Sequence, residues 1–261
     1  MSFIVGEING KIASLSLNNE KKLNALSSEV VNDAVAFIKE CKEKKVLVLL
    51  LKAQANKHNV WSAGHDVSEL PIGRRDPLGY DDSLEVLLRS VKEFPGPVIG
   101  VVRGSVWGAA CDLIMTCDLV YADKTSTFAI TPAKLGVPYN PSGIQHFVNR
   151  IGLNMAKEMF FTAQPVDCVI AEKWGIINRI FEAEELDAKV MEVAQKICAN
   201  APLAVQVSKQ QINMLSDSMS AMNPVTFELL QGLRRKVYDS HDYAEGIASF
   251  KEKRKPVYTG E

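Results

Sequence analysis

The sequence has no excess of either charge and no long hydrophobic run. Lysine and arginine total 30 and aspartate and glutamate 31, a net charge of −1, whereas a generic nucleic-acid-binding protein carries a basic excess or face. The longest apolar run, residues 46–51, is far shorter than the roughly 20 residues that cross a bilayer. No basic segment followed by an apolar one opens the chain, so we expect no signal peptide. These absences predict a cytoplasmic protein that binds neither nucleic acid nor a membrane.

Histidine and cysteine are scarce and follow no metal-binding pattern. The four histidines lack HExxH or similar spacing, and the five cysteines form no CxxC pair. An odd number of such cysteines is typical of small buried side chains in a reducing compartment. With 261 residues, 47% of them hydrophobic, the chain can bury a sizeable core without disulfides or metals. We therefore expect no metal site.

The hydrophobic pattern alternates between strands and helices. Residues 11–17 alternate with period two, whereas the other predicted strands are continuous apolar runs, typical of strands buried on both faces. Serine at 27 or 28 is a plausible N-cap, and the region 53–82 has the composition of a loop. This alternation predicts an α/β fold. Strands are expected at 11–17, 46–51, 98–102 and 118–122, and helices at 30–41, at 84–91 and from about Gly108.

The last part of the chain has a helical pattern throughout. From about residue 183, apolar residues recur every three or four positions. The helices after residue 200 are amphipathic, so each leaves an apolar face that must pack against something. We expect an α/β body over residues 1–200 and an all-helical region over residues 201–261.

Four segments beside the predicted strands or near the end of the chain are candidates for a functional site. Taken singly, each has a structural explanation: a tight turn, close packing of a helix on the sheet, a packed aromatic ring between prolines, or a solvated helix end. Neither a Walker loop nor GxGxxG is present, and GxSxG, a Ser-His-Asp order and a Cys-His pair are also missing. The four segments are residues 61–66, 104–112, 131–140 and 250–256.

Taken together, the two glycine-containing segments favour a single site. A glycine turn that enters a helix exposes unpaired N–H groups at the positive end of the helix dipole. One N–H group from each segment can converge on one oxygen atom and form an oxyanion hole.

The motifs resemble a known family. Residues 62–66 (Ser-Ala-Gly-His-Asp) and 104–109 (Gly-Ser-Val-Trp-Gly-Ala) are similar to the two glycine loops of the crotonase superfamily, the enoyl-CoA hydratase/isomerase fold. Residues 22–26 resemble its N-terminal signature and residues 201–204 the entry to a late helix. The resemblance covers essentially the whole chain. Longer stretches are similar to the members that decarboxylate malonyl-type CoA thioesters, at residues 64–66, 69–71, 75–78, 80–82, 104–108, 135–140 and 237–240.

The resemblance implies roles for individual residues. The backbone N–H groups of His65 and Ala109 would form the oxyanion hole, and Thr131 and Tyr139 would lie beside the acyl group, with Tyr139 orienting the substrate carboxylate. Basic residues at 251–255 would meet the ADP phosphates of CoA. The implied substrate- and CoA-binding residues are Lys22, Ala63, Gly64, His65, Asp66, Val67, Gly108, Ala109, Thr131 and Lys253.

Two departures from the family pattern bear on the reaction. Position 109 is usually glycine and is alanine here, which keeps the N–H group but adds a methyl group. Position 112, usually glutamate in hydratases, is the shorter Asp112, and the second hydratase glutamate falls near Pro132, which cannot titrate. Addition of water to an enoyl thioester depends on a placed acid–base pair. The sequence therefore disfavours hydratase activity.

The resemblance implies a spiral of ββα units followed by a helical trimerisation region, in a homotrimer or a dimer of trimers. It implies a carboxy-lyase that converts methylmalonyl-CoA to propionyl-CoA and CO₂ through a thioester enolate. No biotin or other cofactor is expected, because CoA is part of the substrate. Two alternatives remain: another acyl-CoA enzyme of this fold (hydratase, isomerase or thioesterase), or a catalytically silent homologue that binds CoA or RNA.

Overall fold

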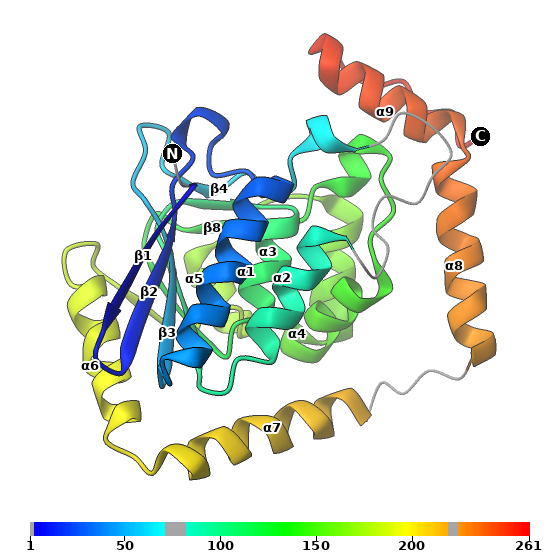
Figure 1. Cartoon of the computed structure of the whole chain (residues 1–261). Coiled ribbons are helices and arrows are strands. Elements are labelled where there is room, and N and C mark those ends of the chain that lie inside the picture. The colour runs from blue at the N-terminus through cyan, green and yellow to red at the C-terminus, as the bar shows by residue number, and fades with distance from the viewer. Residues whose placement is uncertain (1–2, 71–81, 219–223) are drawn as a thin grey trace.

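A computed structural model describes residues 3–70, 82–218 and 224–261. Helices surround two sheets in the body of the molecule, and the last helices extend around it (Figure 1). The strands are β1 Ile4–Asn9, β2 Ile12–Leu17, β3 Val48–Ala53, β4 Val60–Ser62, β5 Val98–Val102, β6 Ser105–Trp107, β7 Leu119–Asp123, β8 Thr127–Ala129, β9 Val166–Asp167 and β10 Arg179–Phe181. The α-helices are α1 Ser28–Glu43, α2 Ser83–Lys92, α3 Ala109–Thr116, α4 Pro141–Thr162, α5 Cys168–Trp174, α6 Leu186–Cys198, α7 Pro202–Ser218, α8 Pro224–Tyr238 and α9 His241–Glu252.

The strands form two sheets. The larger has the order β1-β2-β3-β5-β7-β10, and the smaller has the order β4-β6-β8-β9. Pairing is parallel except for β1 with β2 and β8 with β9. Three successive units each place one strand in the larger sheet, the next strand in the smaller sheet and then a helix: β3-β4-α2, β5-β6-α3 and β7-β8-α4. This repetition is the spiral of ββα units that the family resemblance implies.

The core lies on both faces of the larger sheet. Leu49 and Leu51 of β3 belong to the main apolar cluster, which α1, α2 and α3 also build. Val48 and Leu50 point to the opposite face, where α6 contributes Leu186 and Val190. Alternate side chains of β3 are thus buried on opposite faces, as its continuous apolar run predicts.

Several short elements escape the sequence pattern. β4 and the 3₁₀-helix Val67–Glu69 lie within the predicted loop at 53–82. The parts of the family resemblance that fall at residues 71–81 lie outside the described residues. Strand β6 has three residues and lies within the candidate segment 104–112. A three-residue strand is too short to show a period. β3 begins at Val48 rather than at residue 46.

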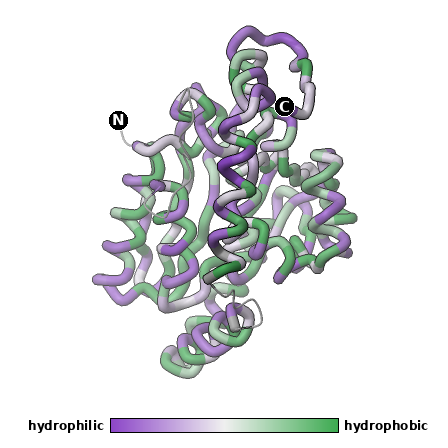
Figure 2. Tube along the Cα trace, turned by 90° about the vertical axis from the view of Figure 1, so that its right-hand side faces the viewer, coloured by the Kyte–Doolittle hydropathy of each residue, from purple (hydrophilic) through white to green (hydrophobic). Residues whose placement is uncertain are grey.

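The C-terminal helices follow the predicted pattern. α7 runs beneath the body, α8 passes along one side, and α9 lies at the opposite end from α7 (Figure 1). Hydrophobic positions recur along α8, which crosses the front of the tube in Figure 2. α9 packs against the 3₁₀-helix Pro132–Leu135, where a Cβ on Gly246 would lie 1.9 Å from the Leu135 carbonyl oxygen. A glycine is therefore required at 246 for this contact.

No helix in the parts of the chain that the structure describes has both the length and the apolar character to cross a membrane. All five cysteines are free thiols, and four of them are buried.

Candidate active site

The four sequence segments do not all reach one place. A cavity opens where the loop after β4, the start of α3, the 3₁₀-helix Pro132–Leu135 and the start of α2 meet, and three of the four segments line it. We call it the acyl cavity. Its lining residues are Ala63, His65, Val67, Leu70, Leu84, Glu85, Gly108, Ala109, Asp112, Thr131, Pro132, Leu135, Val137, Pro138, Tyr139 and Asn140.

The loop after β4 is fastened to the N-terminal signature. The N–H group of Ala63 donates to the carbonyl of Leu23, and the N–H group of Leu26 donates to the carbonyl of Gly64. The side-chain amide of Asn24 donates to the carbonyl of Trp61, at 3.1 Å. Asn24 has a positive φ of 55°, a conformation that asparagine tolerates better than most residues. Residues 22–26 therefore form the support of this loop.

Lys22 and Asp66 join the same two segments through an ion pair. Lys22 Nζ lies 2.6 Å from Asp66 Oδ2. Burial alone would raise the pKa of Asp66, but hydrogen bonds from Lys22 and Ser68 outweigh it and hold the pKa below its usual range. The Asp66 carboxylate also caps the 3₁₀-helix Val67–Glu69 by accepting from the Ser68 N–H group. Lys22 therefore braces the loop, in addition to any contact with a ligand.

The backbone at Gly64 lies against the start of α3. A Cβ on Gly64, whose φ is +87°, would be 2.4 Å from the Trp107 carbonyl oxygen and 3.1 Å from the Ala109 nitrogen. This contact brings the backbone at residue 64 against the backbone of Trp107 and Ala109, and both His65 and Ala109 line the acyl cavity. Neither N–H group donates to another described residue. Gly108 precedes α3 and provides no capping side chain. The two groups are therefore available to an oxygen atom in the cavity.

Thr131 and Tyr139 also line the acyl cavity. Thr131 precedes the 3₁₀-helix, and its Oγ1 would lie 3.6 Å from a Cβ on Gly108. The Tyr139 ring packs edge-on against Phe147 and Phe160, with centroids 6.3 and 5.1 Å away. Its hydroxyl donates to Asp112 Oδ2 at 3.3 Å. Burial, with Asp112 nearby, raises the pKa of Tyr139 well above its ordinary value, so the hydroxyl keeps its proton at neutral pH.

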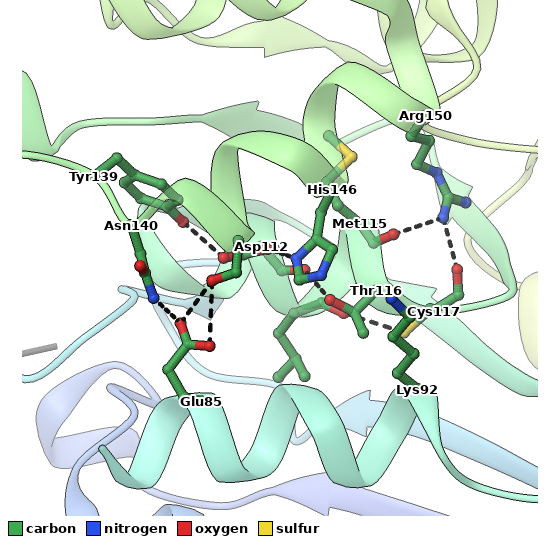
Figure 3. Close-up of polar contacts among 12 residues, drawn as sticks. Glu85, Lys92, Asp112, Met115, Thr116, Cys117, Tyr139, Asn140, His146 and Arg150 are labelled. Atoms are coloured by element: carbon green, nitrogen blue, oxygen red, sulfur yellow. Dashed lines mark hydrogen bonds and ion pairs between the residues drawn. The ribbon is translucent and has the colours of Figure 1, made fainter. Parts of the chain in front are cut away.

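A polar cluster beneath this wall was missed by the sequence analysis. His146 Nδ1 lies 2.7 Å from Asp112 Oδ1, and Tyr139 approaches the other oxygen of the same carboxylate (Figure 3). Burial lowers the pKa of His146, but its hydrogen bond and ion pair with Asp112 raise it more, above the ordinary value. A Cβ on Gly143 would be 2.5 Å from Asp112 Oδ2. A glycine one helical turn before a histidine in α4 is the only sequence trace of this cluster.

Glu85 is the second carboxyl group of the site that sequence reasoning missed. It lies on α2 and is 9% exposed. The Asn140 side-chain amide donates to Glu85 (Figure 3). The Ser142 hydroxyl donates to the same carboxyl group. Burial raises the pKa of Glu85 above its ordinary value, and the charge of Asp112 adds to this.

Lys253 lies apart from these residues. It ends α9 in a left-handed conformation, with φ 54°, and its side chain is exposed and does not line the acyl cavity. In the same basic segment, Arg254 pairs with Glu245 and Glu252. A CoA contact by Lys253 therefore stays a prediction.

Known proteins with similar sequences and structures place the chain in a family. Residues 7–261 match the family described as Enoyl-CoA hydratase/isomerase. The methylmalonyl-CoA decarboxylase of Escherichia coli strain K12 is 43% identical over 250 residues, covering 96% of this chain and 95% of the relative. A short-chain-enoyl-CoA hydratase of Clostridium acetobutylicum is 31% identical over 256 residues, covering 97% and 95%.

Solved structures agree with the sequence relatives. A structure of methylmalonyl-CoA decarboxylase in complex with 2-nitronate-propionyl-CoA superposes with a TM-score of 0.96 at 42% identity, covering 99% of both chains. A methylmalonyl-CoA decarboxylase complexed with 2S-carboxypropyl CoA also has a TM-score of 0.96, at 41% identity and with coverage of 100% and 99%. This chain belongs to the enoyl-CoA hydratase/isomerase family and has the crotonase fold.

Proposed function

We propose that this chain is a carboxy-lyase that converts methylmalonyl-CoA to propionyl-CoA and CO₂. The observation that carries the proposal is that His65 and Ala109 both line the acyl cavity and that neither of their backbone N–H groups has a partner among the described residues. The relatives named methylmalonyl-CoA decarboxylase support the choice of substrate.

The chemistry needs little from side chains. When CO₂ leaves, the electron pair of the broken C–C bond moves onto the thioester, and negative charge develops on its oxygen. Two fixed N–H donors at that oxygen stabilise the transition state, and losing one such donor costs about 2.7–4 kcal/mol. The cavity must also hold the carboxylate out of the thioester plane, so that the breaking bond aligns with the carbonyl π system.

Tyr139 is the proposed orienting group, supported by Thr131. The Tyr139 hydroxyl keeps its proton because its pKa is raised, and Tyr139 lines the acyl cavity. Its 3.3 Å bond to Asp112 is longer than the roughly 2.5–2.7 Å of a strong O–H···O⁻ bond. A substrate carboxylate that enters the cavity can therefore compete for this hydroxyl. Ala63, Gly64, Asp66, Val67 and Gly108 would border the thioester and pantetheine, with Lys22 and Lys253 nearer the phosphates.

Hydratase activity is the second candidate, because a hydratase is among the relatives. Hydration needs a placed acid–base pair. One of the two hydratase glutamates falls near Pro132, which cannot titrate. The Asp112 carboxylate is hydrogen-bonded to both Tyr139 and His146. Decarboxylation is the reaction that these residues support better.

We further propose that residues 1–200 carry the site and residues 201–261 the contacts of a homotrimer or a dimer of trimers. We also propose that the protein works in the cytoplasm and without a cofactor, since CoA is part of the substrate. The five free thiols are consistent with a reducing compartment.

The deciding experiment compares two reactions of the purified chain. Release of CO₂ from methylmalonyl-CoA is measured beside hydration of crotonyl-CoA at equal enzyme concentration. We expect CO₂ release at a rate far above hydration. Hydration without CO₂ release would contradict the proposal, and absence of both activities would favour a silent homologue.

A further inference from the structure

A second cavity lies behind the acyl cavity, between α4 and α7. It is bordered by the last residues of α3 and by the C-terminal end of α2. His146 lines this second cavity, whereas Asp112 lines the acyl cavity. The lining residues are Lys92, Met115, Thr116, Cys117, Asp118, His146, Asn149, Arg150, Ile212, Asn213, Ser216 and Asp217.

The hydrogen-bonded pair Asp112–His146 therefore separates the two cavities. The Asp112 side chain is 3% exposed and the His146 side chain 17%, and 2.7 Å separates Asp112 Oδ1 from His146 Nδ1. The other ring nitrogen of His146, Nε2, bonds to no described residue. One end of the pair thus borders the proposed substrate, and the other end borders a cavity that the substrate does not fill.

Decarboxylation consumes one proton. The C–C bond to the carboxylate breaks, CO₂ leaves, and the electron pair stays in the thioester enolate. The α-carbon of the enolate must then gain a proton to give the saturated acyl-CoA. The substrate itself fills the acyl cavity during this step. Tyr139 is a poor acid, since burial and Asp112 hold its pKa high.

We propose that Asp112 and His146 carry this proton from the second cavity to the acyl cavity. The pair shares one proton between Asp112 Oδ1 and His146 Nδ1, while His146 Nε2 carries the second hydrogen of the imidazolium. The shared proton passes through Asp112 to the α-carbon, so that its bond to the pair breaks as the C–H bond forms, and an aspartate carboxylate and a neutral imidazole with its hydrogen on Nε2 are left. Proton exchange with water in the second cavity converts the imidazole to the tautomer with its hydrogen on Nδ1, donated to Asp112, and the vacant Nε2 then takes one proton from solvent. One proton enters and one is consumed. His146 acts through Asp112 and is a positioning and relay residue, and the inference rests on the proposed function.

The charges around His146 support a proton-holding pair. Asp112 from α3 is its direct partner, and Glu85 from α2 adds a second negative charge, whereas Lys92 of α2 opposes protonation. Lys92 is itself paired with Asp217 of α7, at 2.7 Å. The remaining charged groups that border the second cavity are Asp118 and Arg150. Because the pair must hold a proton to react, kcat should fall as pH rises through the pKa of the pair, which lies above the ordinary histidine value of about 6.5.

Two substitutions at one position test the relay. His146→Asn keeps a hydrogen-bond donor toward Asp112 but cannot carry a proton, and His146→Ala leaves space for imidazole from solution. With methylmalonyl-CoA as substrate, we expect kcat to fall roughly 10²-fold in both variants, as typical of lost acid–base catalysis. KM should stay within about twofold, and added imidazole should restore activity to His146→Ala in proportion to its concentration. His58→Asn is the matched control and should behave as the wild type, because His58 is exposed and its side chain makes no hydrogen bond or ion pair with the described residues.

The results separate the inference from the proposed function. Wild-type protein that releases no CO₂ would overturn both. Active wild-type protein together with an unchanged kcat in His146→Asn, or with a reduced kcat that imidazole does not restore in His146→Ala, would overturn the relay alone. If neither variant folds, the pH dependence of the wild-type kcat decides. A kcat that does not fall as pH rises through the pKa of the pair would also overturn the relay. A large loss of kcat in Glu85→Gln without one in His146→Asn would assign the proton to Glu85 instead.

Discussion

Gly64 approaches Trp107 so closely that a Cβ on residue 64 would lie 2.4 Å from the Trp107 carbonyl oxygen. This approach joins the loop after β4 to the residues that lead into α3. It sets the spacing between the His65 and Ala109 N–H groups, on which the proposed oxyanion hole depends. A positive φ of +87° at Gly64 is a second reason why only glycine fits there.

Substituting Gly64 by alanine should therefore harm both stability and activity. Left-handed backbone costs a residue with a Cβ roughly 1–2 kcal/mol, and relief of the clash must separate the loop from α3. A misplacement of about 1 Å at a reacting centre can cost about 10²-fold in rate. Thermal unfolding and kcat of Gly64→Ala are the measurements.

Gly232→Ala is the control for this substitution. Gly232 lies in α8, where a new Cβ meets nothing within 4 Å. We expect unchanged activity and a small gain in stability, because alanine favours a helix over glycine by about 1 kcal/mol. Wild-type activity and stability in Gly64→Ala would show that the two loops are not coupled in this way.

Tyr139→Phe should lower kcat and leave KM and stability nearly unchanged. The ring contacts with Phe147 and Phe160 remain, and only the hydroxyl is lost. A hydrogen bond to a charged group contributes about 1.5–3 kcal/mol, which corresponds to a roughly 10- to 100-fold fall in kcat. Steady-state kinetics with methylmalonyl-CoA measure the effect. A wild-type kcat would reduce Tyr139 to a packing residue.

The Asp66 carboxylate predicts a particular pH dependence of stability. Its pKa is lowered in the folded chain, so it stabilises the fold above the ordinary aspartate pKa of about 3.9, and this contribution is lost as pH falls through the lower folded value. Asp66→Asn should be less stable than the wild type at pH 7, and the difference should shrink below about pH 4. Urea unfolding from pH 7 to pH 3 measures it. A difference that does not vary with pH would contradict the role of the Lys22–Asp66 pair.

The exposed apolar side chains of α7 and α8 predict self-association. Leu203 is 75% exposed, Leu215 67%, Val225 78% and Leu229 63%. Exposed apolar patches of this kind mark interaction sites. Light scattering at micromolar concentration should give the mass of a trimer or hexamer, and Leu229→Glu should shift it toward a monomer. A monomeric wild-type protein would refute the proposal.

The sequence predicted the elements with strong periodicity. The segments that form β2, α1 and α2 show clear periods and the segment of β5 is a continuous apolar run. The structure confirms each of them, and it places the N-cap of α1 at Ser27. β1 is an edge strand with a half-exposed pattern, so its residues carry little period. α4 was also missed, and its helical pattern is interrupted at Gly152, where φ is 79°.

The site was only partly predictable, for a physical reason. Glycines at 64 and 108 leave a local signature, because backbone geometry demands them. Glu85, Asp112 and His146 come from three different helices, and nothing in their local sequence says that they meet. Ordinary helical spacing gave no indication that His146 would reach Asp112.

The central claim is that catalysis depends on backbone N–H groups at residues 65 and 109, and one comparison tests it. Ala109→Pro deletes one N–H group at the first residue of α3, a helix position that proline tolerates, whereas His65→Ala keeps its N–H group. In variants shown to be folded and to bind CoA, kcat for CO₂ release from methylmalonyl-CoA should fall roughly 10²–10³-fold in Ala109→Pro and stay substantial in His65→Ala. Normal turnover by Ala109→Pro, or complete inactivity of His65→Ala, would contradict the oxyanion hole and would make the His65 imidazole the reacting group.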